Sequence, residues 1–186
     1  MNRFEHEDVT VVERERQRLG KILNDLFGIP IKIRFTVDDL DEKHLNWVEE
    51  ASTKIAKGVL NAPTRNSFSG KRRTYEEIKF DARNGVIAEA MLLQDYAFTE
   101  DLRKHHDVIA CTKNELEIKT WHAGAPATRY NHIFNLEKKK TKYPNVIMFK
   151  RSDGEYTFES YWTFDYDKQI YKEEFCQPQD TILFQT

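Results

Sequence analysis

The spacing of hydrophobic residues differs between the two halves of the chain, and this change limits the possible folds most strongly. As far as about residue 96, apolar side chains recur mainly at intervals of three and four, the pattern of amphipathic helices. From residue 107 onward they mostly alternate with polar side chains, as in strands that bury one face. Helices followed by strands predict an α/β or α+β fold, with a mixed central sheet flanked by helices.

Three helices are expected in the first half, over residues 8–27, 40–60 and 75–96. Asp38 or Asp39 is placed to cap the second helix, and Thr74 is placed to cap the third. Asn84 and Gly85 mark a candidate break within the third helix, because both are poor helix formers.

The strands are expected mainly in the second half, apart from a short extended segment over residues 29–37. The expected elements of the second half are a strand at 107–111, a turn at 112–114, a strand at 115–121, a helix near 128–140 and strands at 146–149 and 156–164. The first two of these strands have the spacing of a hairpin.

The length and composition are those of one folded domain. A chain of 186 residues is long enough for one hydrophobic core and short for two domains, so we expect a single domain over residues 1–186. No apolar stretch approaches the roughly 20 residues that cross a bilayer, and the charged start does not resemble a signal peptide. The two cysteines form neither a disulfide framework nor a zinc motif, so we expect a cytoplasmic location.

The overall charge does not indicate strong unaided binding to nucleic acid. The formal net charge is -2, whereas free-standing DNA-binding proteins usually have an excess of Lys and Arg. Two local basic clusters exist, at residues 71–73 and 138–142. Each is either a solvated face or a contact for phosphate. The histidines His44, His122 and His132 are isolated and are expected at the surface or its boundary.

A row of charged side chains lies along the expected strand at 115–121. Because side chains alternate across a strand, Glu115, Glu117 and Lys119 share one face and Leu116 and Ile118 share the other. Carboxylates two residues apart on one face repel each other, so this row favours a nearby cation. Lys119 could supply part of that charge, and a bound metal ion could supply more.

Asp107 opens the preceding strand of the expected hairpin, and its carboxylate could converge with that of Glu117. Such oxygen ligands suit Mg²⁺, and the backbone carbonyl of Ile118 could add another. A metal ion in this position could activate water and neutralise a phosphate, with Lys119 positioning the nucleophile.

Glu89 is a candidate fourth member of the site. It shares a helical stripe with the apolar residues Val86 and Leu93, where a carboxylate needs a partner. If that helix packs on the hairpin, Glu89 could bind the metal or a metal ligand. The alternatives are that Asp107 only begins a strand, that the charged row is a solvated face, and that Glu89 ends in water.

Three segments together resemble the core of the PD-(D/E)xK restriction endonucleases: Gly85–Glu89, Asp107–Ala110 and Glu117–Lys119. The chain departs from the family pattern at His106, which occupies the position of the family's proline. The resemblance implies a restriction-endonuclease-like core and cleavage of DNA with Mg²⁺. It also implies that Asp107 and Glu117 bind the metal, that Lys119 assists the attacking water, and that Glu89 completes the site.

Taken whole, the chain resembles the small, cleavage-only subunit of a heterodimeric Type IIS restriction endonuclease of bacteria. That resemblance implies a Type II site-specific deoxyribonuclease that cuts one strand of double-stranded DNA. A larger, DNA-recognising subunit would nick the other strand. The sequence contains no helix-turn-helix, zinc finger or other separate DNA-reading motif, as expected of a subunit delivered by a partner.

Three hypotheses therefore stand at this point. The chain is a cleavage subunit that depends on a partner, a self-sufficient homodimeric restriction or repair nuclease, or a non-catalytic interaction protein. The first two share one active site and differ in assembly. The third predicts no metal-dependent cleavage.

Overall fold

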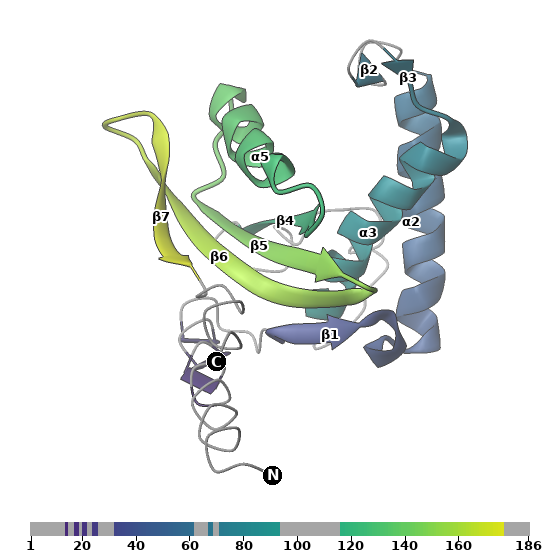
Figure 1. Cartoon of the computed structure of the whole chain (residues 1–186), viewed down its shortest axis with the longest axis horizontal. Coiled ribbons are helices and arrows are strands. Elements are labelled where there is room, and N and C mark those ends of the chain that lie inside the picture. Colours follow the sequence, from purple (N-terminus) through teal and green to yellow (C-terminus); the bar gives the residue numbers. More distant parts are fainter. Residues whose placement is uncertain are drawn as a thin grey trace.

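A mixed five-stranded sheet with helices packed on it forms the body of the structure (Figure 1). The computed structural model describes positions 14, 17, 18, 20, 21, 24 and 25 and residues 32–61, 67–68, 71–93 and 116–176. The elements in these ranges are β1 (Arg34–Thr36), the 3-10 helix η1 (Val37–Asp39), α2 (Glu42–Leu60), β2 (Ser67–Phe68), β3 (Lys71–Arg72), α3 (Tyr75–Leu93), β4 (Leu116–His122), α5 (Ala127–Lys138), β5 (Asn145–Ser152), β6 (Glu155–Asp165) and β7 (Ile170–Cys176).

The order of strands in the main sheet is β1-β6-β5-β4, and β7 also pairs with β6. β4 and β5 are parallel and are connected through α5, whereas the other pairs are antiparallel. This is the arrangement expected of a helical crossover between parallel strands. The predicted mixed α/β architecture is therefore confirmed at this level.

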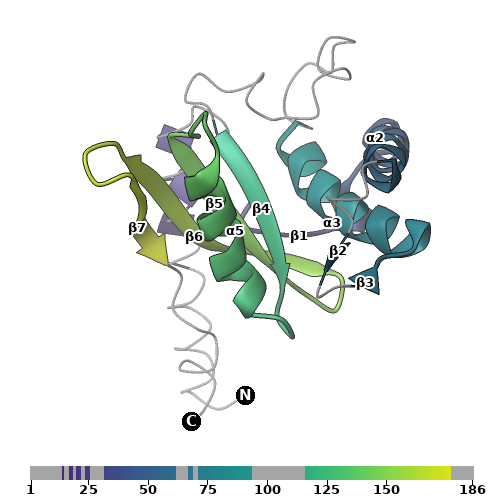
Figure 2. The same ribbon diagram turned by 90° about the horizontal axis from the view of Figure 1, so that it is seen from above.

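Two groups of buried residues cover opposite faces of the sheet. On β5, Ile147 and Phe149 belong to the core formed with α2 and α3, whereas Val146 and Met148 belong to the core formed with α5. All four side chains are fully buried. Alternate residues thus serve two cores, and β4 runs between α5 on one side and α3 on the other (Figure 2).

The second predicted helix is confirmed as α2, but its predicted cap is wrong. Asp41 is the N-cap, and its carboxylate accepts a hydrogen bond of 2.8 Å from the backbone N–H of His44. Asp38 and Asp39 instead belong to η1. There the Asp39 carboxylate accepts a 2.8 Å hydrogen bond from the backbone N–H of Thr36. It therefore caps η1 and not α2.

The third predicted helix is confirmed as α3, and the Thr74 cap is confirmed with it. The Thr74 hydroxyl oxygen accepts a 3.2 Å bond from the N–H of Glu77. The candidate break at Asn84 and Gly85 is wrong, because α3 is continuous through both residues. The hydroxyl of Tyr156 donates to the Asn84 side-chain oxygen over 3.2 Å, so a tertiary contact offsets the weak helix propensity of Asn84.

In the second half, α5, β5 and β6 confirm the predicted helix and strands. Asp153 (φ 51°) and Gly154 (φ 77°) form the turn between β5 and β6. The sequence did not predict β7, and the strand expected over 29–37 is shorter, at Arg34–Thr36. The positions described between 14 and 25 are helical, whereas the expected strand at 107–111 and the turn at 112–114 lie outside the described residues.

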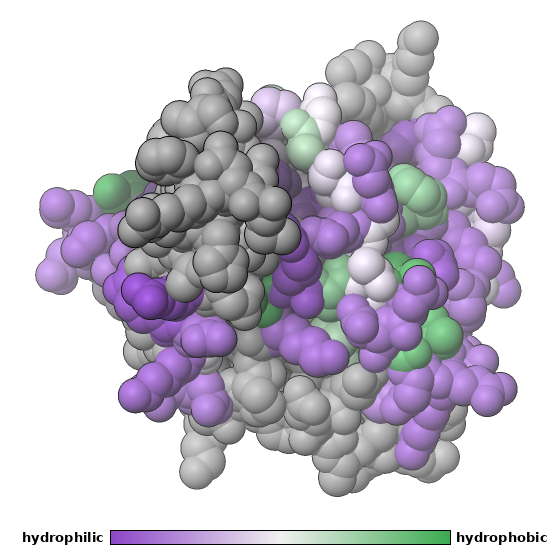
Figure 3. Space-filling model, turned by 60° about the horizontal axis from the view of Figure 1, so that its bottom comes forward, coloured by the Kyte–Doolittle hydropathy of each residue, from purple (hydrophilic) through white to green (hydrophobic). Residues whose placement is uncertain are grey.

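Hydrophilic residues predominate among the described residues on the face shown in Figure 3, where apolar residues form small separate groups. None of the described helices is both long and apolar enough to cross a membrane.

Candidate active site

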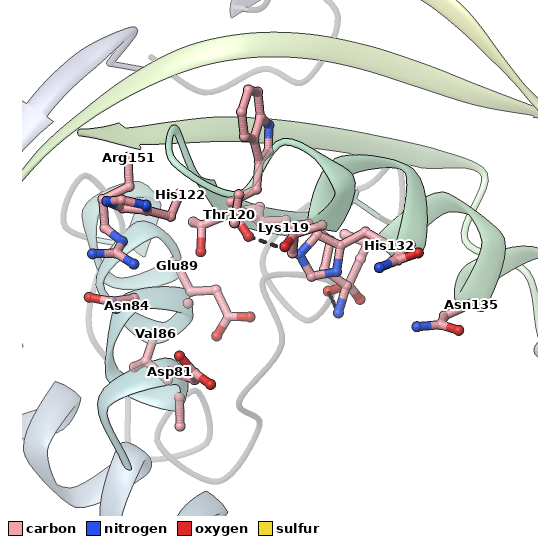
Figure 4. Close-up of a pocket in the computed structure, with 18 of the residues that line it drawn as sticks. Asp81, Asn84, Val86, Glu89, Lys119, Thr120, His122, His132, Asn135 and Arg151 are labelled. Carbon is pink, nitrogen blue, oxygen red and sulfur yellow. Dashed lines mark hydrogen bonds and ion pairs between the residues drawn. The ribbon is translucent and has the colours of Figure 1, made fainter. Parts of the chain in front are cut away.

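A pocket of about 1010 Å³ lies beside β4, with walls from α3, β4 and α5 (Figure 4). Four of the predicted site residues line it: Glu89 from α3 and Glu117, Ile118 and Lys119 from β4. The fifth, Asp107, lies outside the described residues. Residues separated by about 30 positions in the sequence are thus brought to one cavity.

Glu117 is a buried carboxylate on the face of β4 that is turned toward α5. It is paired in register with Val146, which belongs to the core beneath α5, and it is only 6% exposed. On the opposite face, Leu116 and Ile118 pack into the core with α2 and α3. The predicted division of the two faces is confirmed for residues 116–119, whereas Glu115 lies outside the described residues. The charged face is covered rather than solvated at Glu117.

Lys119 lies on the same face as Glu117, one pleat further along β4. Its Nζ is 3.5 Å from Oε1 of Glu117, and its side chain is 29% exposed. A carboxylate removed from water requires a compensating charge or hydrogen bonds. Lys119 supplies one such charge at the wall of the pocket, while its own partial exposure leaves it accessible to a ligand.

Glu89 enters the pocket from a different element. It is partly buried on α3. The residue three positions before it, Val86, and the residue directly after it, Ala90, are both buried. Its carboxylate projects from the helix into the cavity (Figure 4). The prediction that Glu89 lies on the same helical stripe as an apolar residue is therefore confirmed for Val86, which lines the same pocket.

The donor chemistry of the described residues fits Mg²⁺ in part. Glu89 and Glu117 supply carboxylate oxygens to one pocket, and Ile118 lines the same pocket. Within the described residues, no group of three or more His, Cys, Asp or Glu side chains is close enough to hold a metal ion. The expected third carboxylate is Asp107, which the described ranges do not include.

His132 on α5 is a pocket residue that the sequence did not single out as functional. Its Nε2 is 2.8 Å from the carbonyl oxygen of Thr120, which can only accept, so Nε2 carries the proton and Nδ1 is free to act as an acceptor in the neutral ring. Burial lowers the pKa of His132, and the positive charge of Lys119 lowers it further. His132 is therefore a neutral side chain beside Lys119 at physiological pH.

The predicted positions of the three histidines are only partly correct. His122 is exposed and His132 lies at the boundary, as expected. His44 is only 4% exposed, and its Nδ1 contacts the carboxylate of Asp41, so the surface prediction for His44 is wrong. The capping contact of Asp41 holds this ring against the protein at the start of α2.

A polar stripe on α5 could have indicated this wall of the pocket. The residues that α5 and the position following it contribute recur at helical intervals and are polar except for Phe134: Thr128, Asn131, His132, Phe134, Asn135 and Lys139. The periodicity is visible in the sequence. Which face of the helix is turned toward the pocket depends on how α5 crosses the sheet, and that is a tertiary property.

The walls of the pocket carry both signs of charge. Its cationic residues are Arg73, Lys119, Lys139 and Arg151, and its carboxylates are Asp81, Glu89 and Glu117. Arg73 pairs with Asp81 over 2.7 Å. Each of the two basic clusters noted in the sequence thus contributes one side chain to the pocket, Arg73 from the first and Lys139 from the second.

The chain was compared with protein-family models, curated proteins and solved structures, and none of the three comparisons gave a match.

Proposed function

We propose that the chain is a Mg²⁺-dependent DNA endonuclease that hydrolyses a phosphodiester bond at the pocket beside β4. The observation that carries the proposal is the buried Glu117, which is paired with Lys119 in a pocket that Glu89 also lines. A Glu-x-Lys row on an ordinary solvated strand would keep both head groups in water. Burying a carboxylate instead has a cost in stability, which is typical of functional sites.

Each residue has a distinct role in this proposal. Glu89 and Glu117, with Asp107 and the backbone carbonyl of Ile118, would hold Mg²⁺. When bound, Mg²⁺ supplies positive charge to the scissile phosphate and lowers the pKa of a bound water. Lys119 would orient the attacking water and offset charge that develops on the phosphate.

The proposed substrate is double-stranded DNA. The pocket is partly open, and its cationic side chains come from four separate parts of the chain: Arg73, Lys119, Lys139 and Arg151. Positive side chains lining a cavity suit a polyanionic strand. The carboxylates among them are those that the proposal assigns to the metal, apart from Asp81, which Arg73 neutralises.

We further propose that the chain acts as the small subunit of a heterodimeric Type IIS restriction enzyme. A larger subunit would recognise the DNA site and nick the other strand. One support is the resemblance of the sequence to the small, cleavage-only subunit of such enzymes. The other is the net charge of -2, which does not favour strong DNA binding by the chain alone. Site-specific recognition would then come from the partner.

A cleavage assay tests both parts of the proposal. The purified chain is incubated with supercoiled plasmid and Mg²⁺, alone and with a candidate larger subunit. Cleavage that requires the larger protein supports the dependent subunit. Cleavage by the chain alone contradicts dependence but keeps the nuclease, and absence of cleavage under both conditions contradicts the nuclease.

A further inference from the structure

We propose that the end of the pocket formed by Asn84, His122 and Arg151 binds a second phosphate of the DNA backbone, beside the phosphate that is cleaved. This inference rests on the proposed nuclease function and names a subsite within the same cavity. The three side chains come from α3, β4 and β5, and all three line the pocket. Figure 4 shows them on one side of the cavity, with His132 and Asn135 on the other.

Asn84 provides a buried donor that calls for an acceptor. The residue is only 8% exposed, and its side-chain oxygen accepts a hydrogen bond from Tyr156. That bond fixes the orientation of the amide. The Nδ2 group is buried and has no hydrogen-bond partner within the part of the chain that the structure describes. Buried N–H groups are rarely left unsatisfied, so this one points to a ligand that accepts hydrogen bonds.

Arg151 adds a positive charge at the same place. It lies on β5, and its guanidinium carbon is 5.3 Å from the ring centroid of Phe80, which is one helical turn before Asn84 on α3. This contact holds the guanidinium over α3. Within the described ranges Arg151 makes no ion pair, and its planar group suits the oxygens of a phosphate.

His122 adds a third donor. It is paired in register with Arg151 across the parallel strands β4 and β5. The backbone N–H of Gly124 donates to Nδ1 of His122 over 3.0 Å, so in the neutral ring the proton is on Nε2. Of the two pocket carboxylates on α3, Asp81 is bound by Arg73, and Glu89 is the one that the proposed function assigns to the metal. The subsite therefore presents donors and positive charge, which suits a phosphate better than a cation or a neutral acceptor.

The separation from the catalytic residues is suitable for a neighbouring phosphate. His122 is three residues beyond Lys119 on β4, so at about 3.3 Å per residue the two positions are about 10 Å apart. Their side chains leave opposite faces of the strand, and both line the pocket beside β4. A DNA strand has one phosphate for about every 3.4 Å of helix axis. A strand that crosses the pocket from Lys119 to His122 would consequently present another phosphate near Arg151.

Two probes test the subsite independently. The first is inorganic phosphate, titrated into ¹⁵N-labelled protein while the side-chain amide signal of Asn84 is followed by NMR. The second is a fluorescent 20-base-pair duplex, titrated in EDTA at several salt concentrations. The variants are Arg151→Gln and Asn84→Asp, and the control is Arg34→Gln on β1, which lies outside the pocket lining. Thermal unfolding verifies that each variant is folded.

We expect phosphate to shift the Asn84 amide signal in the wild type and the control, and not in Arg151→Gln. Arg151→Gln should weaken duplex binding about tenfold and reduce the salt slope by about 0.9, the value for one lost phosphate contact. Asn84→Asp should weaken binding as well, because it replaces the donor with an anion. Unchanged phosphate shifts and an unchanged salt slope in Arg151→Gln would overturn the subsite.

The failures of the two proposals are distinguishable. If Glu117→Gln abolishes cleavage while Arg151→Gln keeps the full salt slope, the nuclease stands and the phosphate subsite is wrong. If phosphate shifts Asn84 through Arg151 but DNA is never cleaved, with or without a partner protein, the anion site stands and its assignment to DNA is overturned together with the nuclease.

Discussion

Nζ of Lys119 lies 3.5 Å from Oε1 of Glu117, whose side chain is only 7% exposed. The Lys119 side chain is partly exposed to water, whereas the Glu117 side chain is almost fully buried. The lysine partly compensates for the burial of the carboxylate. In the proposed reaction, Glu117 would bind Mg²⁺ and Lys119 would face the phosphate, so these ligands would replace the ion pair as the source of compensating charge.

The first prediction concerns the stability of this pair. Lys119→Met leaves the buried Glu117 carboxylate without one compensating charge, whereas Glu117→Gln removes the buried charge itself. We expect Lys119→Met to lower the free energy of unfolding by about 1–2 kcal/mol more than Glu117→Gln does. Urea unfolding at pH 7 measures the difference. Equal effects of the two substitutions would show that the ion pair does not compensate the buried carboxylate.

The second prediction concerns binding of Mg²⁺ without reference to activity. A ligand that binds only the folded state stabilises it, by about 2.7 kcal/mol at a hundred times its dissociation constant. We expect Mg²⁺ to raise the melting temperature of the wild type and to do so much less in Glu89→Gln. The matched control is Glu50→Gln, an exposed position on α2, which should respond as the wild type does. An undiminished response in Glu89→Gln would remove Glu89 from the site.

The third prediction concerns the pH dependence of stability. The pKa of His132 is lowered in the folded protein from its ordinary value of 6.5. Above about pH 6.5 the ring is neutral in both states, and its contribution to stability is fully present. As the pH falls below 6.5, the unfolded chain binds a proton more readily than the folded protein, so this contribution decreases until the folded pKa is reached.

Urea unfolding of the wild type and of His132→Gln between pH 5 and 8 measures this contribution. We expect the difference in stability between the two proteins to decrease as the pH falls below 6.5. A difference that is independent of pH over this range would show that His132 titrates alike in the folded and unfolded states.

The fourth prediction concerns the anchor of Asn84. Tyr156 is 2% exposed, and burial raises the pKa of its hydroxyl to about 12, so the group remains a proton donor. Tyr156→Phe removes the bond to the Asn84 oxygen, and we expect a loss of about 1–2 kcal/mol in the free energy of unfolding. Tyr130→Phe, at a position 65% exposed, should change stability little. Equal effects at the two tyrosines would contradict the anchoring role.

Local periodicity was sufficient to predict the helices α2, α3 and α5 and the faces of β4. The alternation of side chains placed Glu117 and Lys119 together, and the pair is observed. The burial of Glu117 was not predictable in the same way, because it depends on α5 crossing that face of the sheet. The parallel pairing of β4 with β5 follows from the same crossover.

Tertiary packing explains two of the predictions that failed. Asn84 has weak helix propensity, but Tyr156, 72 positions away in the sequence, anchors its side chain within α3. His44 was expected near the surface, but it lies in the first turn of α2 on the face that is buried against the core. Both outcomes depend on how the helices pack, which the local sequence pattern does not show. The hairpin expected to bring Asp107 to Glu117 remains a prediction.

The most direct test of the central claim compares isosteric variants in one cleavage assay. The initial rate of nicking of supercoiled plasmid with Mg²⁺ is measured for the wild type, Glu117→Gln and Glu50→Gln, each with a candidate larger subunit. We predict that Glu117→Gln reduces the rate by about a hundredfold or more, while its melting temperature and that of the control stay near the wild type. An undiminished rate in a folded Glu117→Gln protein would contradict the account.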